Sequence, residues 1–345
     1  MGRAAQFLTK RRGDWTDWAC YAYLALGVLL MFGPVLWLGA SSLKSPAALA
    51  EYPPTLLPWE QARAQVPGYP APLPVFEVTR GPQAGQTLAE VRRIGLQAQM
   101  VPLEGGPIVR VPAADRTKVM RLRAATENYT GLAGRFEFGR ILWNSVFITV
   151  VATLLTLLVN SMAAFGLSKF RFAGRQPVFL LMLATLMVPP TIVLVPNYLI
   201  ASQLGLVNSL WGVIWPGIAT PTGVFLLRQY MLTLPDDLIE AARMDNASEW
   251  RIYWRIVLPL SAPALAVLAI FSAMWRWNDF LWPMVVLSRS EVFTLPLALN
   301  AFQGELTTQW NYVLSMTVAT LLPITVLFLF LQRHITQGIA SAGVK

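Results

Sequence analysis

Six long apolar runs constrain this chain more than any other feature of its sequence. They lie at 19–39, 141–167, 178–201, 206–227, 256–287 and 312–331. A helix needs about 20 apolar residues to cross roughly 30 Å of hydrocarbon. Charged residues make up only 13% of the 345, against about 25% in soluble domains. The sequence therefore predicts an all-α membrane protein with six transmembrane helices, the fifth run including interfacial residues because it exceeds one crossing.

Basic residues flank these runs and predict their orientation. The net charge is +9, and positive charge favours the cytoplasmic side of a membrane. If the N-terminus is cytoplasmic, the two short outer loops contain a single basic residue, Arg289. We therefore expect a multi-pass protein of the cytoplasmic membrane with both termini inside, in contact with lipid and with no nucleic acid. The inner basic residues are Arg3, Lys10, Arg11, Arg12, Lys169, Arg171, Arg175, Arg228, Arg243, Arg251, Arg255, Arg333 and Lys345.

Several kinds of chemistry lack the residues they require. Cys20 and His334 are the only cysteine and histidine, which excludes an intrachain disulfide and the histidine-rich metal sites. The sequence has neither a GxxxxGK[ST] phosphate loop nor a GxGxxG fingerprint. We predict no cofactor, no metal and no catalytic residue. Any use of ATP must then depend on a partner.

The segment between the first two runs differs from the rest. Residues 41–139 are polar and proline-rich and lie outside on this topology. Alternating or apolar stretches predict strands at 74–79, 98–103 and 108–111, and helices at 88–94 and 117–125. We interpret about 61–124 as a small extracytoplasmic α+β insert. The predicted organisation is 1–40 for the cytoplasmic tail and first helix, 41–139 for the outer loop, 140–333 for five further helices, and 334–345 for a cytoplasmic tail.

The loop at 234–259 carries the most specific motif. Its charged residues would be costly in lipid, so it must lie in water or against protein. Pro235 suits the first turn of a helix, and the acidic residues after it suit the positive helix end. Ala241 and Ala242 leave a small face that a partner can approach closely. Asn246 then interrupts the helix, and a second helix is predicted from about Ser248.

These residues resemble the EAA loop of binding-protein-dependent ABC importer permeases. The resemblance rests on Glu240-Ala241-Ala242, on Asp245 three residues later, and on the closing Leu258-Pro259. It implies coupling helices that dock on an ATPase subunit. The family usually has glycine where this chain has Asn246, and asparagine is the non-glycine residue that best tolerates a left-handed turn.

Other motifs resemble the sugar permease subfamily similar to the smaller permease subunit of the maltose transporter. They include Ser42-Leu43-Lys44, Glu127-Asn128-Tyr129, Asn144-Ser145 and the Trp277-to-Pro283 stretch. In relatives the C-terminal tail, here Gly343-Val344-Lys345, reaches the ATPase dimer interface. The insert is a departure, because relatives usually have a short loop there.

Residues of a solute pathway are less clearly marked. Prolines interrupt the third and fourth runs, which is typical both of pathway-lining helices and of simple kinks. Asn278, Asp279 and Trp277 lie in the fifth run and are candidate pathway residues. Arg276 could pair with Asp279 on one helix. The tryptophans there could stack on a sugar or belong to an interfacial belt, and Asn160 is expected to join helices.

The sequence thus predicts half of the membrane pathway of an ATP-driven sugar importer, working by alternating access. The implied partners are a second homologous permease, two ATPase subunits and an extracytoplasmic solute-binding protein. Alternatives are an ABC permease for glycerol phosphate or an amino acid, and an ion-driven secondary transporter. A membrane enzyme would need a nucleophile–base or metal constellation. The insert is either a contact for the binding protein or an insertion without a role.

Overall fold

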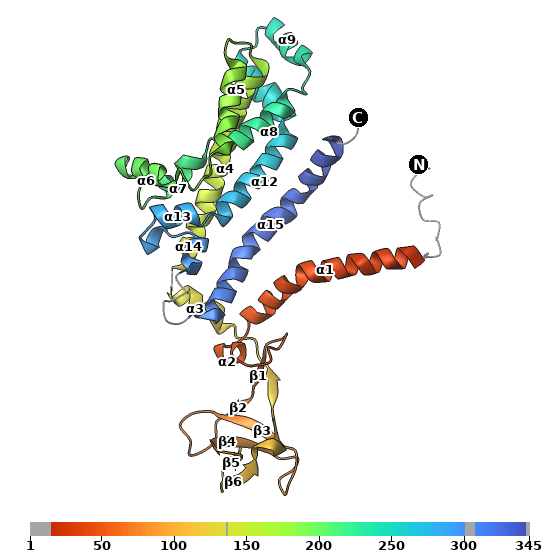
Figure 1. Cartoon of the computed structure of the whole chain (residues 1–345), viewed down its shortest axis with the longest axis vertical. Coiled ribbons are helices and arrows are strands. Elements are labelled where there is room, and N and C mark those ends of the chain that lie inside the picture. The colour runs from red at the N-terminus through yellow and green to blue at the C-terminus, as the bar shows by residue number, and fades with distance from the viewer. Residues whose placement is uncertain (1–14, 136, 301–307, 343–345) are drawn as a thin grey trace. The chain divides into compact units, whose positions relative to one another are not determined.

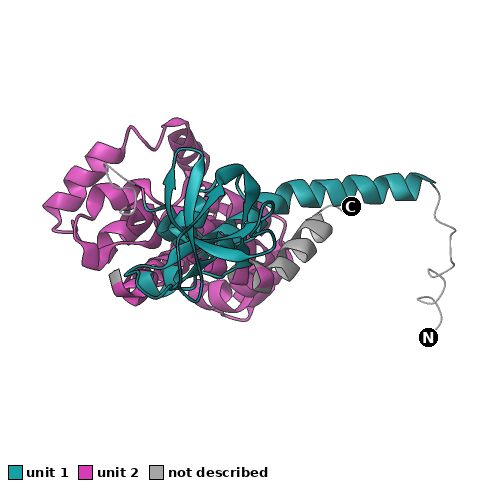
Figure 2. Cartoon of the chain, turned by 90° about the horizontal axis from the view of Figure 1, so that it is seen from below, with its two compact units in different colours: residues 1–131, 309–318 teal, residues 132–308, 319–345 magenta. Residues whose placement is uncertain are grey.

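The computed structural model describes residues 15–135, 137–300 and 308–342. The chain forms two compact units, coloured separately in Figure 2. Unit 1 comprises residues 1–131 and 309–318, and unit 2 comprises 132–308 and 319–345. The candidate C-terminal contacts Gly343, Val344 and Lys345 lie outside the described residues.

Unit 1 begins with the long helix α1 (Trp15–Ser42), followed by the short α2 (Pro46–Leu49). The side chain of Asn128, on α3 (Glu127–Arg135), then joins several segments. It donates to the carbonyl oxygens of Ser42 and Lys44 at 2.8 and 2.9 Å and accepts from Asn311 at 3.1 Å. Asn311 lies at the start of α15 (Trp310–Ala342). A single buried amide thus satisfies the carbonyls left free where α1 ends.

The rest of unit 1 is antiparallel sheet. Phe76, Leu88, Met100 and Val111 share a buried core. The main sheet has the order β2-β3-β4-β5-β6, with β7 on β3, and a separate ribbon pairs β1 with β8. The strands are β1 (Trp59–Gln61), β2 (Arg63–Ala64), β3 (Leu73–Val78), β4 (Thr87–Ile94), β5 (Gln97–Pro102), β6 (Val109–Pro112), β7 (Arg116–Lys118) and β8 (Met120–Leu122), with a 3₁₀ turn η1 (Ala113–Asp115).

Three strands predicted from the sequence are present, but the two predicted helices of the insert are wrong. Residues 88–94 form most of β4, and residues 117–125 include β7 and β8. β4 pairs with β3 on one side and β5 on the other. Because both neighbours supply backbone partners, the local helix-like pattern is overridden. Among the described residues, this segment is a β structure rather than α+β.

Unit 2 is helical, and its centre is α4 (Phe138–Lys169). This helix packs against α8 (Pro221–Met231) and α12 (Ala262–Asn278), and the three lie side by side in Figure 1. Phe165, Leu227 and Tyr253 belong to its core. The other helices are α5 (Arg175–Ala184), η2 (Thr185–Met187), α6 (Leu194–Gln203), α7 (Leu210–Ile214), η3 (Trp215–Gly217), α9 (Asp236–Met244), α10 (Glu249–Ile252), η4 (Tyr253–Val257), α11 (Leu258–Leu260), α13 (Leu281–Val286), η5 (Ser290–Val292), α14 (Leu295–Asn300) and the remainder of α15.

Some of the apolar runs form one continuous helix, and others are broken into several helices. Of the described helices, α1 and α4 are long and apolar enough to cross a membrane, and two bent pairs make four if each pair is one span. The bends are 48° between α7–η3 and α8, and 77° between Glu249–Leu260 and α12. The third run is not one helix, since it breaks between η2 and α6, where Pro189 and Pro190 stand. Proline removes a backbone donor and disfavours helix in the residue before it.

Candidate functional site

Helix α9 forms the first half of the 234–259 loop. Pro235 precedes it with extended backbone angles, and Asp236 and Asp237 occupy its acidic first turn. Acidic residues there are favoured by the exposed backbone N–H groups of the helix start. Ile239 is the buried residue of α9, whereas Glu240 and Ala241 are exposed. The helix therefore packs on the core of unit 2 through Ile239 and the half-buried Ala242, and it leaves Glu240 and Ala241 exposed.

Asn246 ends this helix in the left-handed conformation expected from the sequence, with φ of 56°. The N–H of Ala247 donates to the carbonyl of Ala242, and the N–H of Asn246 to that of Arg243, both at 3.0 Å. This pair of bonds is a Schellman motif, which satisfies carbonyls at a helix end. Asparagine thus supports the turn in which the family usually has glycine.

The second half of the loop is a helix of mixed type. Ser248 caps it by accepting from the N–H of Arg251 at 3.3 Å. Residues Glu249–Leu260, here called the elbow segment, run through α10, the π-helical η4 and α11. Its Tyr253 is buried and bonds with Ser161 of α4 at 2.7 Å. The bend of 77° then leads into α12, and the predicted residues Leu258 and Pro259 lie just before it.

Lys169, the last residue of α4, joins that helix to the start of α9. Its Nζ donates to the carbonyl of Leu234 at 2.7 Å and to Oδ1 of Asp236 at 2.6 Å. The Lys169 side chain is 3% exposed, whereas that of Asp236 is 69% exposed. The hydrogen bond from Lys169 lowers the pKa of Asp236 below its ordinary value. A cation buried against protein thus holds the N-terminus of α9 through one charged and one neutral acceptor.

Arg243 joins the two halves of the loop at the other end of α9. Its Nε and Nη2 donate to the two carboxylate oxygens of Glu249 at 2.7 and 3.2 Å. These hydrogen bonds raise the pKa of Arg243. Two-pronged arginine–carboxylate contacts fix relative orientation better than single ones. Together with the turn at Asn246, this contact sets the angle between α9 and the elbow segment.

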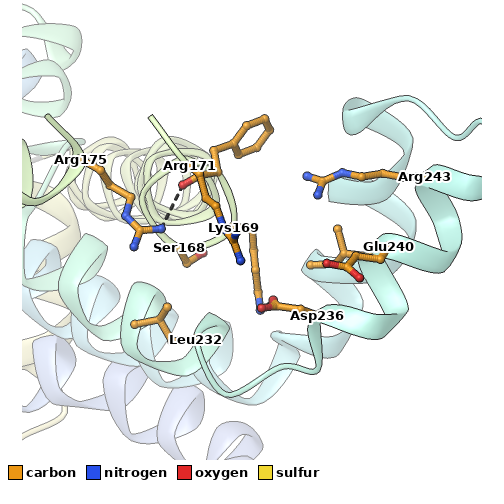
Figure 3. Close-up of a pocket in the computed structure, with 10 residues that line it drawn as sticks. Ser168, Lys169, Arg171, Arg175, Leu232, Asp236, Glu240 and Arg243 are labelled. Atoms are coloured by element: carbon orange, nitrogen blue, oxygen red, sulfur yellow. Dashed lines mark hydrogen bonds and ion pairs between the residues drawn. The ribbon is translucent and has the colours of Figure 1, made fainter. Parts of the chain in front are cut away.

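An open pocket of about 470 Å³ lies between α9 and the loop that follows α4. Figure 3 shows Lys169, Arg171 and Arg175 on one side, and Glu240 and Arg243 on the other. Arg175 donates to the carbonyl of Phe170 at 3.0 Å. Lys169, which lines this pocket, also bonds to the start of α9.

The candidate pathway residues do not form one cluster. Trp277 is 4% exposed, and its indole N–H donates to the carbonyl of Thr320 at 3.0 Å. A side chain so enclosed cannot contact a solute in this conformation. Asn278 is exposed and donates to the carbonyl of Met274 at 2.8 Å. Asp279 accepts from the N–H of Trp282 at 3.4 Å, at the break between α12 and α13.

The pairing of Arg276 with Asp279 that the sequence allows is not formed as an ion pair in the described structure. The two make no ion pair within 4 Å in the described structure; Arg276 instead donates to the carbonyl of Val213 at 3.5 Å. Its guanidinium lies where a Cβ on Gly217 would stand. Asp279 lies where α12 ends, so the helical i, i+3 spacing behind the expectation does not hold there.

The expectation for Asn160 agrees with its contacts. This fully buried amide donates to Oγ1 of Thr220 at 2.7 Å and accepts from the N–H of Thr220 at 3.0 Å. Thr220 is the N-cap of α8, just after the 48° bend. Asn160 therefore joins α4 to the break in the fourth run.

Sequence reasoning missed the structural roles of Lys169 and Asn144. Lys169 was assigned only to the orientation of the chain. Asn144 donates to the carbonyls of Glu291 and Phe293 at 2.9 and 3.1 Å. The polar residues inside or at the end of an apolar helix were the available signal, because such residues usually bond to another segment.

Comparisons with known proteins agree with this architecture. Residues 141–341 match the family described as "Binding-protein-dependent transport system inner membrane component". The arabinooligosaccharides transport system permease protein AraQ of Halalkalibacterium halodurans is 42% identical over 202 residues, which are 59% of this chain and 72% of the relative. The lactose transport system permease protein LacG of Rhizobium radiobacter is 32% identical over 227 residues, 66% and 83% of the two chains.

Two further comparisons broaden this picture. The sn-glycerol-3-phosphate transport system permease protein UgpE of Yersinia enterocolitica is 34% identical over 207 residues, 59% of this chain and 74% of the relative. A solved structure, of a bacterial ABC transporter involved in the import of the acidic polysaccharide alginate, superposes with a TM-score of 0.66. It covers 94% of this chain and 98% of its own at 20% identity, which shows a shared fold.

Proposed function

This chain belongs to the family of binding-protein-dependent transport system inner membrane components, and from that membership we propose that it forms half of the membrane pathway of an ATP-driven sugar importer. The observation that carries the proposal is the 234–259 loop. It presents Glu240 and Ala241 of α9 outward while three contacts, made by Lys169, Asn246 and Arg243, fix the helix to the rest of unit 2. A helix held in this way can transmit force.

The proposed topology has six spans with both termini in the cytoplasm. The first and second spans are α1 and α4, and the remaining four use the broken or shorter helices. The 234–259 loop then lies on the cytoplasmic side, and the β structure at 59–122 lies on the outer side. Positive charge near the inner ends supports this orientation.

The proposed partners are a second homologous permease, two ATPase subunits and an extracytoplasmic solute-binding protein. ATP-driven closure of the ATPase dimer would move α9, and the link at Lys169 would pass that movement to α4. The two permeases would then turn their shared pathway outward, and hydrolysis would return it inward. ATP hydrolysis belongs to the partner subunits in this scheme.

Sugars are the proposed substrate class because relatives named for arabinooligosaccharides and lactose match over most of their length. The relative named for sn-glycerol-3-phosphate favours a second candidate, a small phosphorylated solute. Competition for transport by an oligosaccharide or by glycerol phosphate separates the two. An ion-driven secondary transporter remains the alternative of another class.

The test is co-purification of ATPase subunits with the full chain and with Glu240→Lys. Glu240 is exposed on α9, so reversing its charge should disturb a docking surface without disturbing the fold. The matched control is Glu104→Lys, an exposed carboxylate in the segment at 59–122. We expect the wild type and the control to retain the ATPase, and Glu240→Lys to lose it or to lose transport-linked hydrolysis.

The opposite result is equally clear. A wild-type chain that binds no ATPase, and whose transport follows an ion gradient, would contradict the proposal. Transport measurements in proteoliposomes with either ATP or a proton gradient provide that distinction.

A further inference from the structure

The elbow segment presents an exposed face of its own, apart from Glu240 and Ala241 on α9. Trp250 and Trp254 are 58% and 43% exposed, and Arg251 and Arg255 are exposed beside them. Each pair is four residues apart, so the two tryptophans share one side of the helix and the two arginines the next. The opposite side, with Ile252, is buried.

The two tryptophan rings contact each other and the ring of Tyr253, but the side chains of neither pair make a hydrogen bond or ion pair within the described chain. Arg251 and Arg255 make no ion pair among the described residues, and the nearest acidic residue in sequence, Glu249, is bound by Arg243. The indole N–H groups of Trp250 and Trp254 likewise have no hydrogen-bond acceptor there. By contrast, the buried indole of Trp277 donates to a backbone carbonyl. The exposed pair therefore resembles groups that are satisfied by an environment outside the chain.

The direction of the elbow segment indicates what that environment is. It meets α12 at 77°, so it lies nearly parallel to the membrane surface if α12 crosses the membrane. A helix in that position with an apolar aromatic side and a basic side is typical of interfacial binding. Tryptophan rings favour the headgroup level, and arginine favours anionic phosphates.

A further exposed tryptophan supports this depth. Trp143 is 64% exposed and lies near the start of α4. Trp143 is 18 residues before Ser161, the residue that bonds with the elbow segment. At 1.5 Å per residue this is about 27 Å, close to the roughly 30 Å of the hydrocarbon core.

We infer that the Trp250–Trp254 and Arg251–Arg255 face of the elbow segment binds anionic phospholipid of the cytoplasmic leaflet. This inference rests on the topology in the proposed function. The tryptophans enter the boundary between headgroups and acyl chains, and the arginines contact phosphate oxygens. Lipid bound here holds the elbow segment at the membrane surface, so that α9 moves relative to an elbow segment that stays in place.

The test uses the full chain in lipid nanodiscs with a photoreactive phosphatidylglycerol. Labelled peptides are mapped by mass spectrometry, so other lipid contacts do not obscure this one. We expect labelling of 249–260 that excess phosphatidylglycerol suppresses and phosphatidylcholine does not. Arg251→Gln/Arg255→Gln should reduce it about tenfold or more, since each basic residue near an anionic surface is worth several-fold in affinity.

The controls make the result specific. Arg92→Gln/Arg110→Gln removes two exposed arginines from the segment at 59–122 and should leave the labelling unchanged. The single variants Arg251→Gln and Arg255→Gln, each expected to lose about fivefold, decide the matter if the double variant does not fold. Labelling that is absent, independent of the arginines, or suppressed equally by phosphatidylcholine would overturn the inference.

A further labelling experiment separates this inference from the proposed function. The same labelling is repeated with the ATPase subunits bound. Continued labelling supports a lipid-facing surface, whereas its loss on ATPase binding would show that a protein covers this face. In the latter case the coupling proposal stands and the lipid site does not.

Discussion

At the scale of single residues, polar side chains fix the loop at 234–259, and Lys169 is the most consequential of them. A buried cation loses hydration, and it is stable only when acceptors replace the water. Lys169 has two, the carbonyl of Leu234 and the carboxylate of Asp236. Its aliphatic stem alone would not orient the start of α9.

We therefore predict that Lys169→Met uncouples the importer while leaving it assembled. Methionine keeps the apolar volume of the stem but removes both hydrogen bonds. ATPase subunits should still co-purify, whereas transport per ATP hydrolysed should fall at least severalfold. Arg171→Met is the matched control, because Arg171 lines the same pocket and acts on Asp236 only through its charge, without a hydrogen bond to α9 among the described residues. Equal transport per ATP in both variants would contradict a role for Lys169.

The ion pair also has a defined pH dependence. The pKa of Asp236 is lowered in the folded chain by Lys169, so its contribution is present above the ordinary carboxyl pKa and is lost as the pH falls through the lowered one. The loss of transport per ATP hydrolysed that Lys169→Met causes should therefore be constant between about pH 6 and 8. A transport assay in proteoliposomes across that range measures it, and a deficit that changes with pH there would indicate another titrating group.

Two substitutions of Asn246 are predicted to change the stability of the folded chain in different directions. Its φ of 56° suits glycine and penalises a β-branched residue. Asn246→Gly should be neutral or slightly stabilising, and Asn246→Val should destabilise by about 1–2 kcal/mol. Thermal unfolding of the purified chain in detergent measures both. A stable Asn246→Val would mean that the turn can form without a left-handed residue.

At the scale of elements, two asparagines from the polar motifs of the sequence connect segments that are distant along the chain. Asn128 gathers the end of α1 and the start of α15, and Asn144 holds the segment before α14. Each uses one side-chain amide to satisfy two backbone carbonyls. In lipid, such contacts position helices because the hydrophobic effect cannot.

We predict that Asn160→Leu destabilises unit 2 by about 1–2 kcal/mol, since it leaves the N–H of Thr220 without its acceptor. Asn278→Leu is the matched control: it makes the same change at an exposed amide that bonds to Met274 of its own helix. Thermal unfolding should distinguish the two. If Asn278 lines the pathway, its variant should instead lose transport while remaining stable. A smaller loss of stability for Asn160→Leu than for Asn278→Leu would contradict the assigned role.

At the scale of the whole molecule, the β structure at 59–122 has its own core and closely spaced ends. Trp59 pairs with Leu122, and the N–H of Arg123 donates to the carbonyl of Pro58 at 3.0 Å. A segment whose ends meet in this way can be replaced by a short linker without stretching the flanking chain. The helices of unit 2 do not need it to complete their core.

We predict that replacing residues 59–122 with a four-residue glycine–serine linker leaves ATPase co-purification intact. The informative measurement is the affinity of the solute-binding protein for the assembled importer. Loss of that affinity would support the hypothesis that this segment contacts the binding protein, and unchanged affinity and transport would exclude it. Loss of the ATPase as well would mean that the two units depend on each other for folding.

The sequence by itself determined the features that depend on local composition and on neighbours along the chain. Hydropathy over about 20 residues identified the membrane class and most helices, and the spacing around Glu240 identified the loop. The conformation of Asn246 also followed, because the penalty for a left-handed residue is a property of that residue alone.

Only the tertiary structure decided what depends on partners distant in sequence. Residues 88–94 are a strand because β3 and β5 supply hydrogen bonds on both sides. Trp277 is buried because Thr320, 43 residues away, accepts its N–H, and Lys169 bonds to Asp236, 67 residues away. Such contacts are set by the packing of whole elements, and no pattern within either segment specifies which pair will meet.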